Sequence, residues 1–351
     1  MMLRSVTYGF YLTFLFALLA CQKEEVGPQF AEGDVNAQGI RSVYVLNEGN
    51  FNWGNASLSI YNPDTKTVNN RFFEATNEYA LGDVAQSITI RPTENRAYIV
   101  VNNSSKIEVV KLSDFTSEGV ITGFNSPRYM SFSNDNTAYV SDLYDNNIYK
   151  LNTETMEISK RIAANGWTED LWYQKNNLFV LNRGESELWV LNTITDTWEN
   201  KFNFGEGLID MTVDEDNNIY LLQSPEEGVS SLLKFNSTSK TLEATHEFPI
   251  GIRPQQIRVY RDKLYYIAND VYRVDLNDMT LPGVTIVEAG NRLFYNLEIN
   301  PEDGAIYISD AVDYVQNGWV YVYDSSGAEK DRFEVNSIPG AIYFYNKEAP
   351  F

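Results

Sequence analysis

Short apolar segments recur along the chain at a regular interval, and each carries an aromatic residue at an equivalent place. Successive aromatic residues of this set lie 40 to 54 residues apart, and they are Tyr44, Tyr98, Tyr139, Phe179, Tyr220, Tyr265 and Tyr307. The segments around them, such as residues 305–308, are short and rich in β-branched and aromatic side chains. A helix would need apolar residues at a spacing of 3.6 over ten or more positions. The pattern therefore predicts an all-β repeat protein.

A second landmark follows each aromatic segment and marks the end of a further strand. Pairs such as Leu151-Asn152 and Leu191-Asn192 lead into turns rich in Ser, Thr and Asp, whose short polar side chains satisfy the turn backbone. Another strand comes next, for example residues 157–163. Four short strands in about 40–45 residues are typical of a β-propeller blade. We therefore predict seven four-stranded blades over residues 41–351.

The two ends of the array indicate how the ring closes. The innermost strands carry pairs of apolar residues, of which Leu297 and Ile299 are one example. The first repeat lacks such a pair, and a seventh pair, Ile342 and Phe344, stands near the C-terminus with no repeat after it. The C-terminal strand is therefore expected to complete the N-terminal blade, which leaves no half-blade edge exposed.

The N-terminal segment has the pattern of an export signal. Arg4 precedes an apolar run over residues 8–19, which is too short to span a bilayer. The run ends Leu-Leu-Ala-Cys, which resembles the bacterial lipobox, so residues 1–20 are predicted to be a lipoprotein signal peptide and Cys21 the lipidated residue. Residues 21–40 read as a flexible tether. The sequence Lys-Glu-Glu at 23–25 resembles the surface-export signal of Bacteroidota lipoproteins, so we expect an outer-membrane protein that faces outward and contacts the membrane only through its lipid.

The net negative charge and the single histidine argue against several classes of function for this protein. The chain has 27 basic and 48 acidic residues, a net charge of −21, which disfavours nucleic acids and anionic lipids as partners. Acidity that merely keeps a surface protein soluble is the simpler reading. The one histidine, His246, lies in an outer-strand pattern, which argues against a Ser-His-Asp triad and a Cys/His zinc site. We therefore expect no enzyme, no catalytic residues, no cofactor and no metal site. A calcium-dependent, lactonase-like activity of the carboxylates and a structural calcium ion stay as lesser alternatives.

The loops between second and third strands, together with the loops between blades, share one face of a propeller, and in this chain they are rich in Asn and aromatic residues. Amide groups both donate and accept hydrogen bonds, and aromatic rings offer rigid flat area, so together they suit a broad ligand with a polar periphery. The alternative is that turns need Asn and Gly, and that the aromatic residues pack between blades. The candidate ligand-binding residues are Asn50, Phe51, Trp53, Asn55, Asn102, Asn103, Arg128, Tyr129, Asp142, Tyr144, Asn182, Arg183, Arg253, Arg292, Asp310, Tyr314 and Trp319.

Several of these loop segments resemble one family. The repeat as a whole is similar to YncE-like and surface-layer propellers. The motifs Asn-Glu-Gly-Asn-Phe (47–51), Ser-Pro-Arg-Tyr (126–129) and Asp-Ala-Val-Asp-Tyr (310–314), with the segments 81–87, 100–104 and 339–341, resemble the BtuG family of Bacteroidota. Members of that family are surface lipoproteins that bind vitamin B12 and cap its outer-membrane transporter.

The resemblance implies a corrinoid ligand, cobalamin first, and a TonB-dependent outer-membrane vitamin B12 transporter as partner. One of four arginines, Arg128, Arg183, Arg253 or Arg292, would then pair with the corrinoid phosphate. A protein- or glycan-interaction propeller without a small-molecule site is the alternative from another class.

Overall fold

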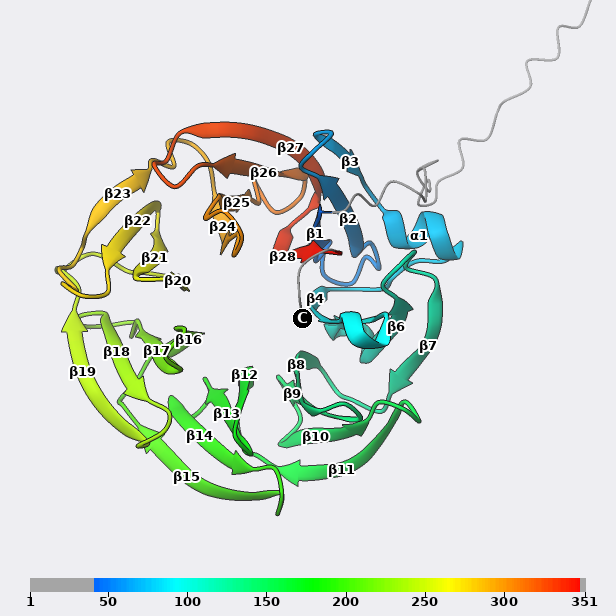
Figure 1. Ribbon diagram of the computed structural model, residues 1–351, viewed down its shortest axis with the longest axis horizontal. Helices are drawn as coiled ribbons and strands as arrows, with labels where there is room; N and C mark the ends of the chain where they lie inside the picture. The colour runs from blue at the N-terminus through cyan, green and yellow to red at the C-terminus, as the bar shows by residue number, and fades with distance from the viewer. Residues whose placement is uncertain (1–40, 348–351) are drawn as a thin grey trace, which may run out of the picture.

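The computed structural model describes residues 41–347, which form a ring of seven four-stranded antiparallel sheets (Figure 1). The predicted signal peptide and the tether with Cys21 lie outside the described residues. Within the described range, no helix is long and apolar enough to cross a membrane. The prediction of an all-β, seven-bladed propeller with four-stranded blades is confirmed.

The blades follow one another along the chain, and the strands of each blade are ordered from the ring axis outward. Blade 1 contains β28 (Pro339–Asn346), β1 (Arg41–Asn47), β2 (Ser57–Asn62) and β3 (Thr67–Asn69), and blade 2 contains β4 (Ala85–Arg91), β5 (Arg96–Val101), β6 (Lys106–Lys111) and β7 (Ser117–Thr122). Blade 3 contains β8 (Pro127–Asn134), β9 (Thr137–Asp142), β10 (Asn147–Asn152) and β11 (Glu157–Ala163), and blade 4 contains β12 (Thr168–Gln174), β13 (Asn177–Asn182), β14 (Glu187–Asn192) and β15 (Thr197–Asn203). Blade 5 contains β16 (Leu208–Val213), β17 (Asn218–Gln223), β18 (Ser231–Asn236) and β19 (Thr241–Glu247). Blade 6 contains β20 (Gln256–Tyr260), β21 (Lys263–Ala268), β22 (Asp270–Asp275) and β23 (Val284–Val287), and blade 7 contains β24 (Phe294–Ile299), β25 (Ile306–Asp310), β26 (Asn317–Tyr323) and β27 (Glu329–Ser337).

Ring closure joins the two ends of the described chain in one sheet. Strand β1 pairs antiparallel with β2 on one side and with β28 on the other, and Tyr44 lies opposite both Ile60 and Tyr343. In Figure 1 the red strand β28 lies beside the blue strand β1. The predicted closure by the C-terminal strand is therefore confirmed.

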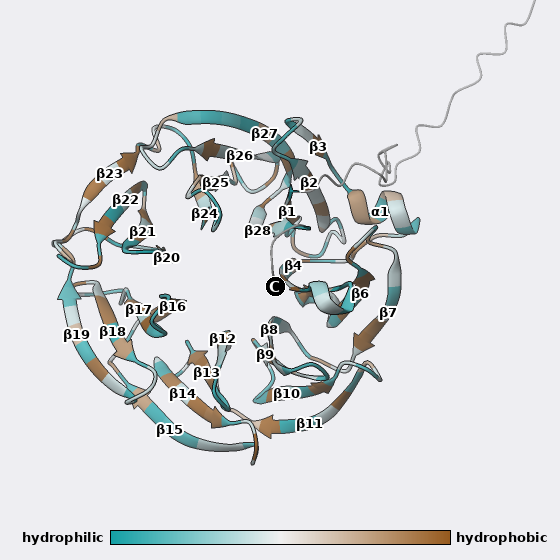
Figure 2. Cartoon of the chain, in the orientation of Figure 1, coloured by the Kyte–Doolittle hydropathy of each residue, from teal (hydrophilic) through white to brown (hydrophobic). Residues whose placement is uncertain are grey.

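The hydrophobic core lies between neighbouring blades. All seven repeat aromatics of the second strands are buried, and Tyr98 of blade 2, for example, packs edge-on against Phe132 of blade 3 with ring centroids 5.4 Å apart. Burial of one such ring stabilises the fold by about 1.5–3 kcal/mol. Hydrophilic residues predominate on outer strands such as β15 and β27 (Figure 2). His246 lies on outer strand β19 and is partly exposed, as its pattern predicts.

Blade 1 departs from the repeat at its outer edge. Strand β3 has three residues, and a short helix, α1 (Phe72–Asn77), follows it on the outside of the ring (Figure 1). Two 3₁₀ helices, Pro92–Glu94 and Asn102–Ser104, complete the helical structure of the described residues. Phe72 inserts into the core against Phe115, with ring centroids 6.0 Å apart.

Helix α1 also buries a carboxyl group. Glu74 is fully buried, Arg71 lies 3.5 Å from its Oε1, and neither carboxyl oxygen makes a hydrogen bond of normal geometry. Burial raises the pKa of Glu74 to about 7, against the opposite effects of its own backbone N–H, Arg71 and the backbone of Leu81. This helix therefore contains a carboxyl group that the fold prefers to keep protonated.

Candidate ligand-binding site at the centre of the ring

Beta-bulges at the entrance of the innermost strands turn consecutive side chains toward the ring axis. Six of these strands pair irregularly with their neighbours at their first residues. A bulge places an extra residue on one strand and re-aims its side chains. The residues at the bulges all line one cavity of about 320 Å³, and they are Gln86, Arg128, Tyr129, Glu169, Asp170, Ile209, Tyr295 and Gly340. The same backbone irregularity thus builds the cavity wall blade by blade.

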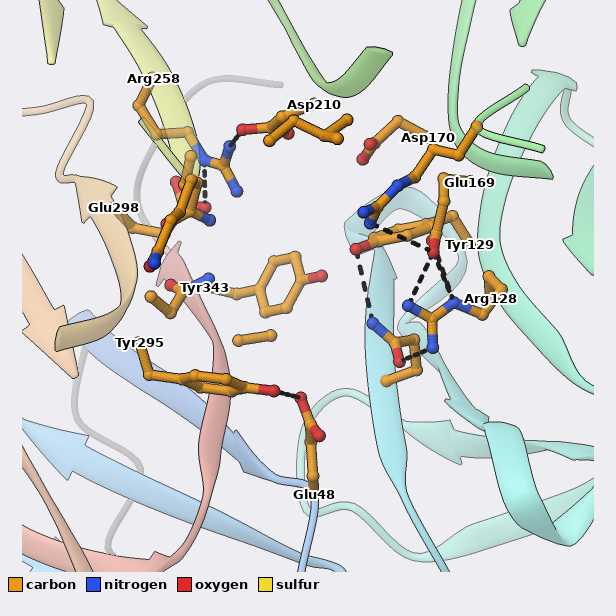
Figure 3. A pocket seen from close by; sticks show the side chains of 18 of the residues that line it. Glu48, Arg128, Tyr129, Glu169, Asp170, Asp210, Arg258, Tyr295, Glu298 and Tyr343 are labelled. Atoms are coloured by element: carbon orange, nitrogen blue, oxygen red, sulfur yellow. Dashed lines mark hydrogen bonds and ion pairs between the residues drawn. The ribbon is translucent and has the colours of Figure 1, made fainter. Parts of the chain in front are cut away.

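An arginine–glutamate pair forms one wall of the cavity. Arg128 donates to both carboxyl oxygens of Glu169, at 2.9 Å from Nε and 2.8 Å from Nη2, and its Nη1 donates to Gln86 at 2.5 Å (Figure 3). Arg183 lies 4.0 Å from the same carboxylate, and its guanidinium stacks 4.3 Å from the ring of Trp167. Burial disfavours the charged form of Arg128, yet the pairing with Glu169 leaves its pKa raised. The planar fork of Arg128 is therefore fully used inside the protein.

A second arginine orders the opposite wall. Arg258 donates from Nε to Glu298 at 2.6 Å and from Nη1 to Asp210 at 3.3 Å (Figure 3). Burial raises the pKa of both carboxyl groups, and Arg258 partly offsets this effect. Asp170 has its pKa raised as well, first by burial and then by the nearby carboxylates of Asp210 and Glu169. The cavity is therefore polar, ion-paired and crowded with acids.

Tyrosines connect this cavity to the loop face. Tyr295 donates its hydroxyl to Glu48 at 3.0 Å, and Tyr314 packs edge-on above its ring with centroids 5.7 Å apart. Burial raises the pKa of Glu48, and the Tyr295 hydrogen bond lowers it in part. Tyr343 of β28 lines the centre of the cavity (Figure 3). Gly340 of the same strand has no room for a side chain, since a Cβ there would overlap the Glu48 carboxylate.

The predicted site residues divide into four groups by their position. Four of them, Arg128, Tyr129, Arg183 and Tyr314, line the cavity together. Three more are aromatic rings exposed on loops of the same face. The exposed fractions are 65% for Phe51, 73% for Trp53 and 73% for Tyr144. These three exposed rings, here called the aromatic rim, lie on loops of the face at which the polar cavity is built, and they are not among its lining residues.

The amide and carboxyl residues at the ends of second strands have their polar groups used in holding loops. Asp142 accepts four backbone N–H bonds of 2.8 to 3.1 Å, from Asn125, Ser126, Tyr144 and Asp145. Asn102, Asn182 and Asp310 likewise bind the neighbouring between-blade loop, through the backbone of Pro127, Asn165 and Leu293. Asn50 and Asn55 bind each other, and Asn50 also donates to the backbone carbonyl of Tyr314. Asn103 donates to Asp83 and Asn52. These groups shape the face because their hydrogen bonds fix both kinds of loop.

The remaining predicted residues lie away from the cavity. Arg253 donates to the backbone of Pro225 and Glu226. Arg292 donates to the Tyr323 hydroxyl and to the backbone of Ala289 and Glu288, and its guanidinium stacks on Phe294 and Tyr321. Trp319 packs against the core between blades 6 and 7. Of the four arginines considered for a ligand phosphate, Arg183 alone combines a place in the cavity with a loosely held guanidinium.

Several of the residues that line the cavity were not predicted from the sequence. They lie on innermost strands and are Gln86, Glu169, Asp170, Asp210, Gln256, Arg258, Asn296, Glu298 and Tyr343, with Glu48 from a loop. The sequence does contain a feature that predicts them. On an innermost strand, a polar residue between the two apolar residues faces the ring axis, as Arg258 does between Ile257 and Val259. Among the described residues, no group of three or more His, Cys, Asp or Glu is arranged to hold a metal ion.

The family to which the chain belongs follows from comparison with family models. The model described as a domain of unknown function, DUF5074, matches residues 41–347. This chain is a member of the DUF5074 family. The match covers the whole propeller and leaves out the predicted signal peptide and tether. No curated protein matches this DUF5074 chain.

Solved structures show that the DUF5074 fold is shared with propellers of varied function. A quinoprotein alcohol dehydrogenase-like protein from Bacteroides thetaiotaomicron is 13% identical, with a TM-score of 0.71 over 89% of this chain and 79% of its own. The dihydro-heme d1 dehydrogenase NirN is 13% identical, with a TM-score of 0.60 over 90% and 76%. Apo AztD from Citrobacter koseri is 9% identical, with a TM-score of 0.57 over 87% and 97%. At these identities the likeness concerns the fold alone.

Proposed function

We propose that this DUF5074 propeller is a surface-anchored binding protein that captures a broad small molecule with a polar periphery, a corrinoid such as cobalamin, and passes it to an outer-membrane transporter. The observation that carries the proposal is the exposed aromatic rim, Phe51, Trp53 and Tyr144, on the loop face above a polar cavity. A flat ligand with amides at its edge would lie on these rings and hydrogen-bond to the polar groups beneath them.

Preorganisation of the cavity supports capture. The two hydrogen bonds of Arg128 to Glu169 and the one of Arg258 to Glu298 hold side chains that would otherwise lose freedom on binding. Fixing rotamers before the ligand arrives reduces the entropic cost of association. Arg183 lies close to the loop face with one ion pair of 4.0 Å, and it is the arginine that could turn to a ligand phosphate.

The finer assignment to a corrinoid rests on sequence. The loop motifs that resemble the BtuG family include Ser-Pro-Arg-Tyr at 126–129, whose arginine and tyrosine line the cavity. The lipobox-like run that ends at Cys21 and the Lys-Glu-Glu at 23–25 support display at the cell surface. Transfer to a transporter is the step that such a location would serve.

Calorimetry with cyanocobalamin at micromolar protein tests this proposal. A surface capture protein works against dilution, so we expect a dissociation constant of about 1 nM or below. The red corrinoid should also co-elute with the protein on desalting. If neither heat nor co-elution is observed, the corrinoid assignment fails, and a protein- or glycan-interaction role for the loop face takes its place.

A further inference from the structure

The cavity beneath the aromatic rim has two more carboxyl groups than guanidinium groups. Five carboxyl groups line it, from Glu48, Glu169, Asp170, Asp210 and Glu298, and three guanidinium groups, from Arg128, Arg183 and Arg258. Five minus three leaves a surplus of two. The cavity therefore has a formal charge of −2 when all its groups are ionised.

The pattern of ion pairs shows which two carboxyl groups are in surplus. Glu169 is paired with Arg128 and Arg183, whereas Asp210 and Glu298 share Arg258. Neither Asp170 nor Glu48 has an ion pair with a described residue, and Glu48 accepts one hydrogen bond from Tyr295. Figure 3 shows Asp170 pointing into the open part of the cavity while Asp210 turns toward Arg258. The two surplus groups come from blade 4 and from the loop after β1, on different sides of the ring.

An unpaired acceptor in the same cavity independently indicates the kind of group that the cavity would bind. Asn296 of β24 is 6% exposed and lines the cavity, and its Oδ1 accepts no hydrogen bond among the described residues. Buried polar atoms in folded proteins nearly always have a partner, because leaving one unpaired costs about 1–3 kcal/mol. A ligand with N–H donors would satisfy this oxygen.

The aromatic walls favour the same chemistry. Tyr129, Tyr295 and Tyr343 line the same cavity as the two surplus carboxyl groups. Tyrosine rings attract cations to their faces and also cover alkyl chains. A primary ammonium group has three N–H donors and no acceptor, which suits a site whose unpaired groups are acceptors.

We propose that the cavity binds a short aliphatic diamine, with one ammonium group at Asp170 and the other beside Glu48 and Asn296. The two positive charges match the surplus of two carboxylates, and the alkyl chain lies along the tyrosines. This inference goes beyond the proposed corrinoid capture, because it concerns the polar cavity below the rim and holds whether or not a corrinoid binds above it.

Calorimetric titration with putrescine at pH 8 and low salt tests the proposal. The wild-type protein should bind one putrescine per chain, and Asp170→Asn and Glu48→Gln should each weaken binding at least about tenfold, because each removes one surplus charge. Asp262→Asn is the matched control. It removes the same charge from an exposed side chain in the turn between β20 and β21, on the opposite face, and should leave binding unchanged.

Two further measurements on the wild-type protein need no variant. Butylammonium, which has one charge and a chain of the same length, should bind at least about tenfold more weakly than putrescine. Burial raises the pKa of Asp170 and Glu48, so the binding of putrescine should weaken as the pH falls from 8 to 5. For the same reason, the binding of putrescine should release protons into the buffer.

The proposal is overturned if the wild-type protein does not bind putrescine, or if both variants bind it as the wild type does. Equal affinity for butylammonium and putrescine would also overturn it, since only one ammonium group would then be recognised. Cyanocobalamin is titrated separately, so failure of corrinoid capture and failure of diamine binding are distinguished.

Discussion

Trp53 offers the sharpest test of ligand capture on the loop face. Its side chain is 73% exposed in the loop between β1 and β2, and it contributes nothing to the buried core. An aromatic side chain of this size has about 250 Å² of surface, so about 180 Å² is available to a ligand. Complete coverage would be worth about 4.5 kcal/mol at about 25 cal/mol per Å².

A flat ligand covers one face of the ring, so about half of that value applies. We expect Trp53→Ala to weaken binding of cyanocobalamin by about 2 kcal/mol, which is about a thirtyfold rise in the dissociation constant. Calorimetry gives the constant directly. Thermal unfolding should be unchanged, because the ring is exposed and removing it leaves no cavity.

Ile194→Ala is the matched control for this substitution. Ile194 is 72% exposed, almost the same fraction as Trp53, but it lies in the turn between β14 and β15 on the opposite face of the ring. Its substitution should leave the dissociation constant within about twofold. If Trp53→Ala also binds within twofold of the wild type while the wild type binds tightly, the aromatic rim is not the binding surface.

Other predictions concern closure, helix α1, the cavity wall and the anchor. Truncation after Ser337 removes β28 and should lower the melting temperature of the whole ring, and an unchanged melting curve would contradict coupling through closure. The pKa of Glu74 is about 7 against a usual 4.5, so the fold loses stability as the pH rises from 4.5 to 7. Between pH 4.5 and pH 8, the free energy of unfolding by urea should therefore rise by about 3 kcal/mol in Glu74→Gln relative to the wild type. A difference between the two proteins that is constant with pH would show that the titration of Glu74 is not the cause. Gly340→Ala should displace the Glu48 carboxylate and weaken putrescine binding at least about tenfold by calorimetry, and unchanged affinity would show that the wall adapts. Cys21→Ala should move the protein from the membrane fraction to the soluble fraction, and retention in the membrane would point to another anchor.

The fold could be predicted from the sequence because every repeat has the same pattern of apolar and aromatic residues, which favours four short β-strands. The apolar pairs of the innermost strands and the aromatic residues of the second strands recur seven times, and a missing first pair with an extra last one specifies closure. Helix α1 is an exception, since it occurs in one blade and interrupts the pattern after β3.

The cavity was harder to predict, because a bulge changes which side chains face inward. With regular alternation Glu169 and Asp170 would point to opposite sides of β12, but the irregular pairing between Thr168 and Leu171 lets both line the cavity. Polar residues at strand ends, such as Asp142, were conspicuous in the sequence, yet their side chains accept hydrogen bonds from the backbone of loops. Composition alone does not separate a group that fixes a loop from one that faces a ligand.

The position of β28 has a consequence for the order in which the protein folds and becomes able to bind. This strand supplies Gly340 and Tyr343 to the cavity wall, and it also completes the blade that β1 begins. During folding, blades 2 to 7 can assemble while the wall of the cavity still lacks one side. Binding competence should therefore arise only after β28 has paired with β1, and fragments cleaved before β28 should not compete with intact protein for ligand.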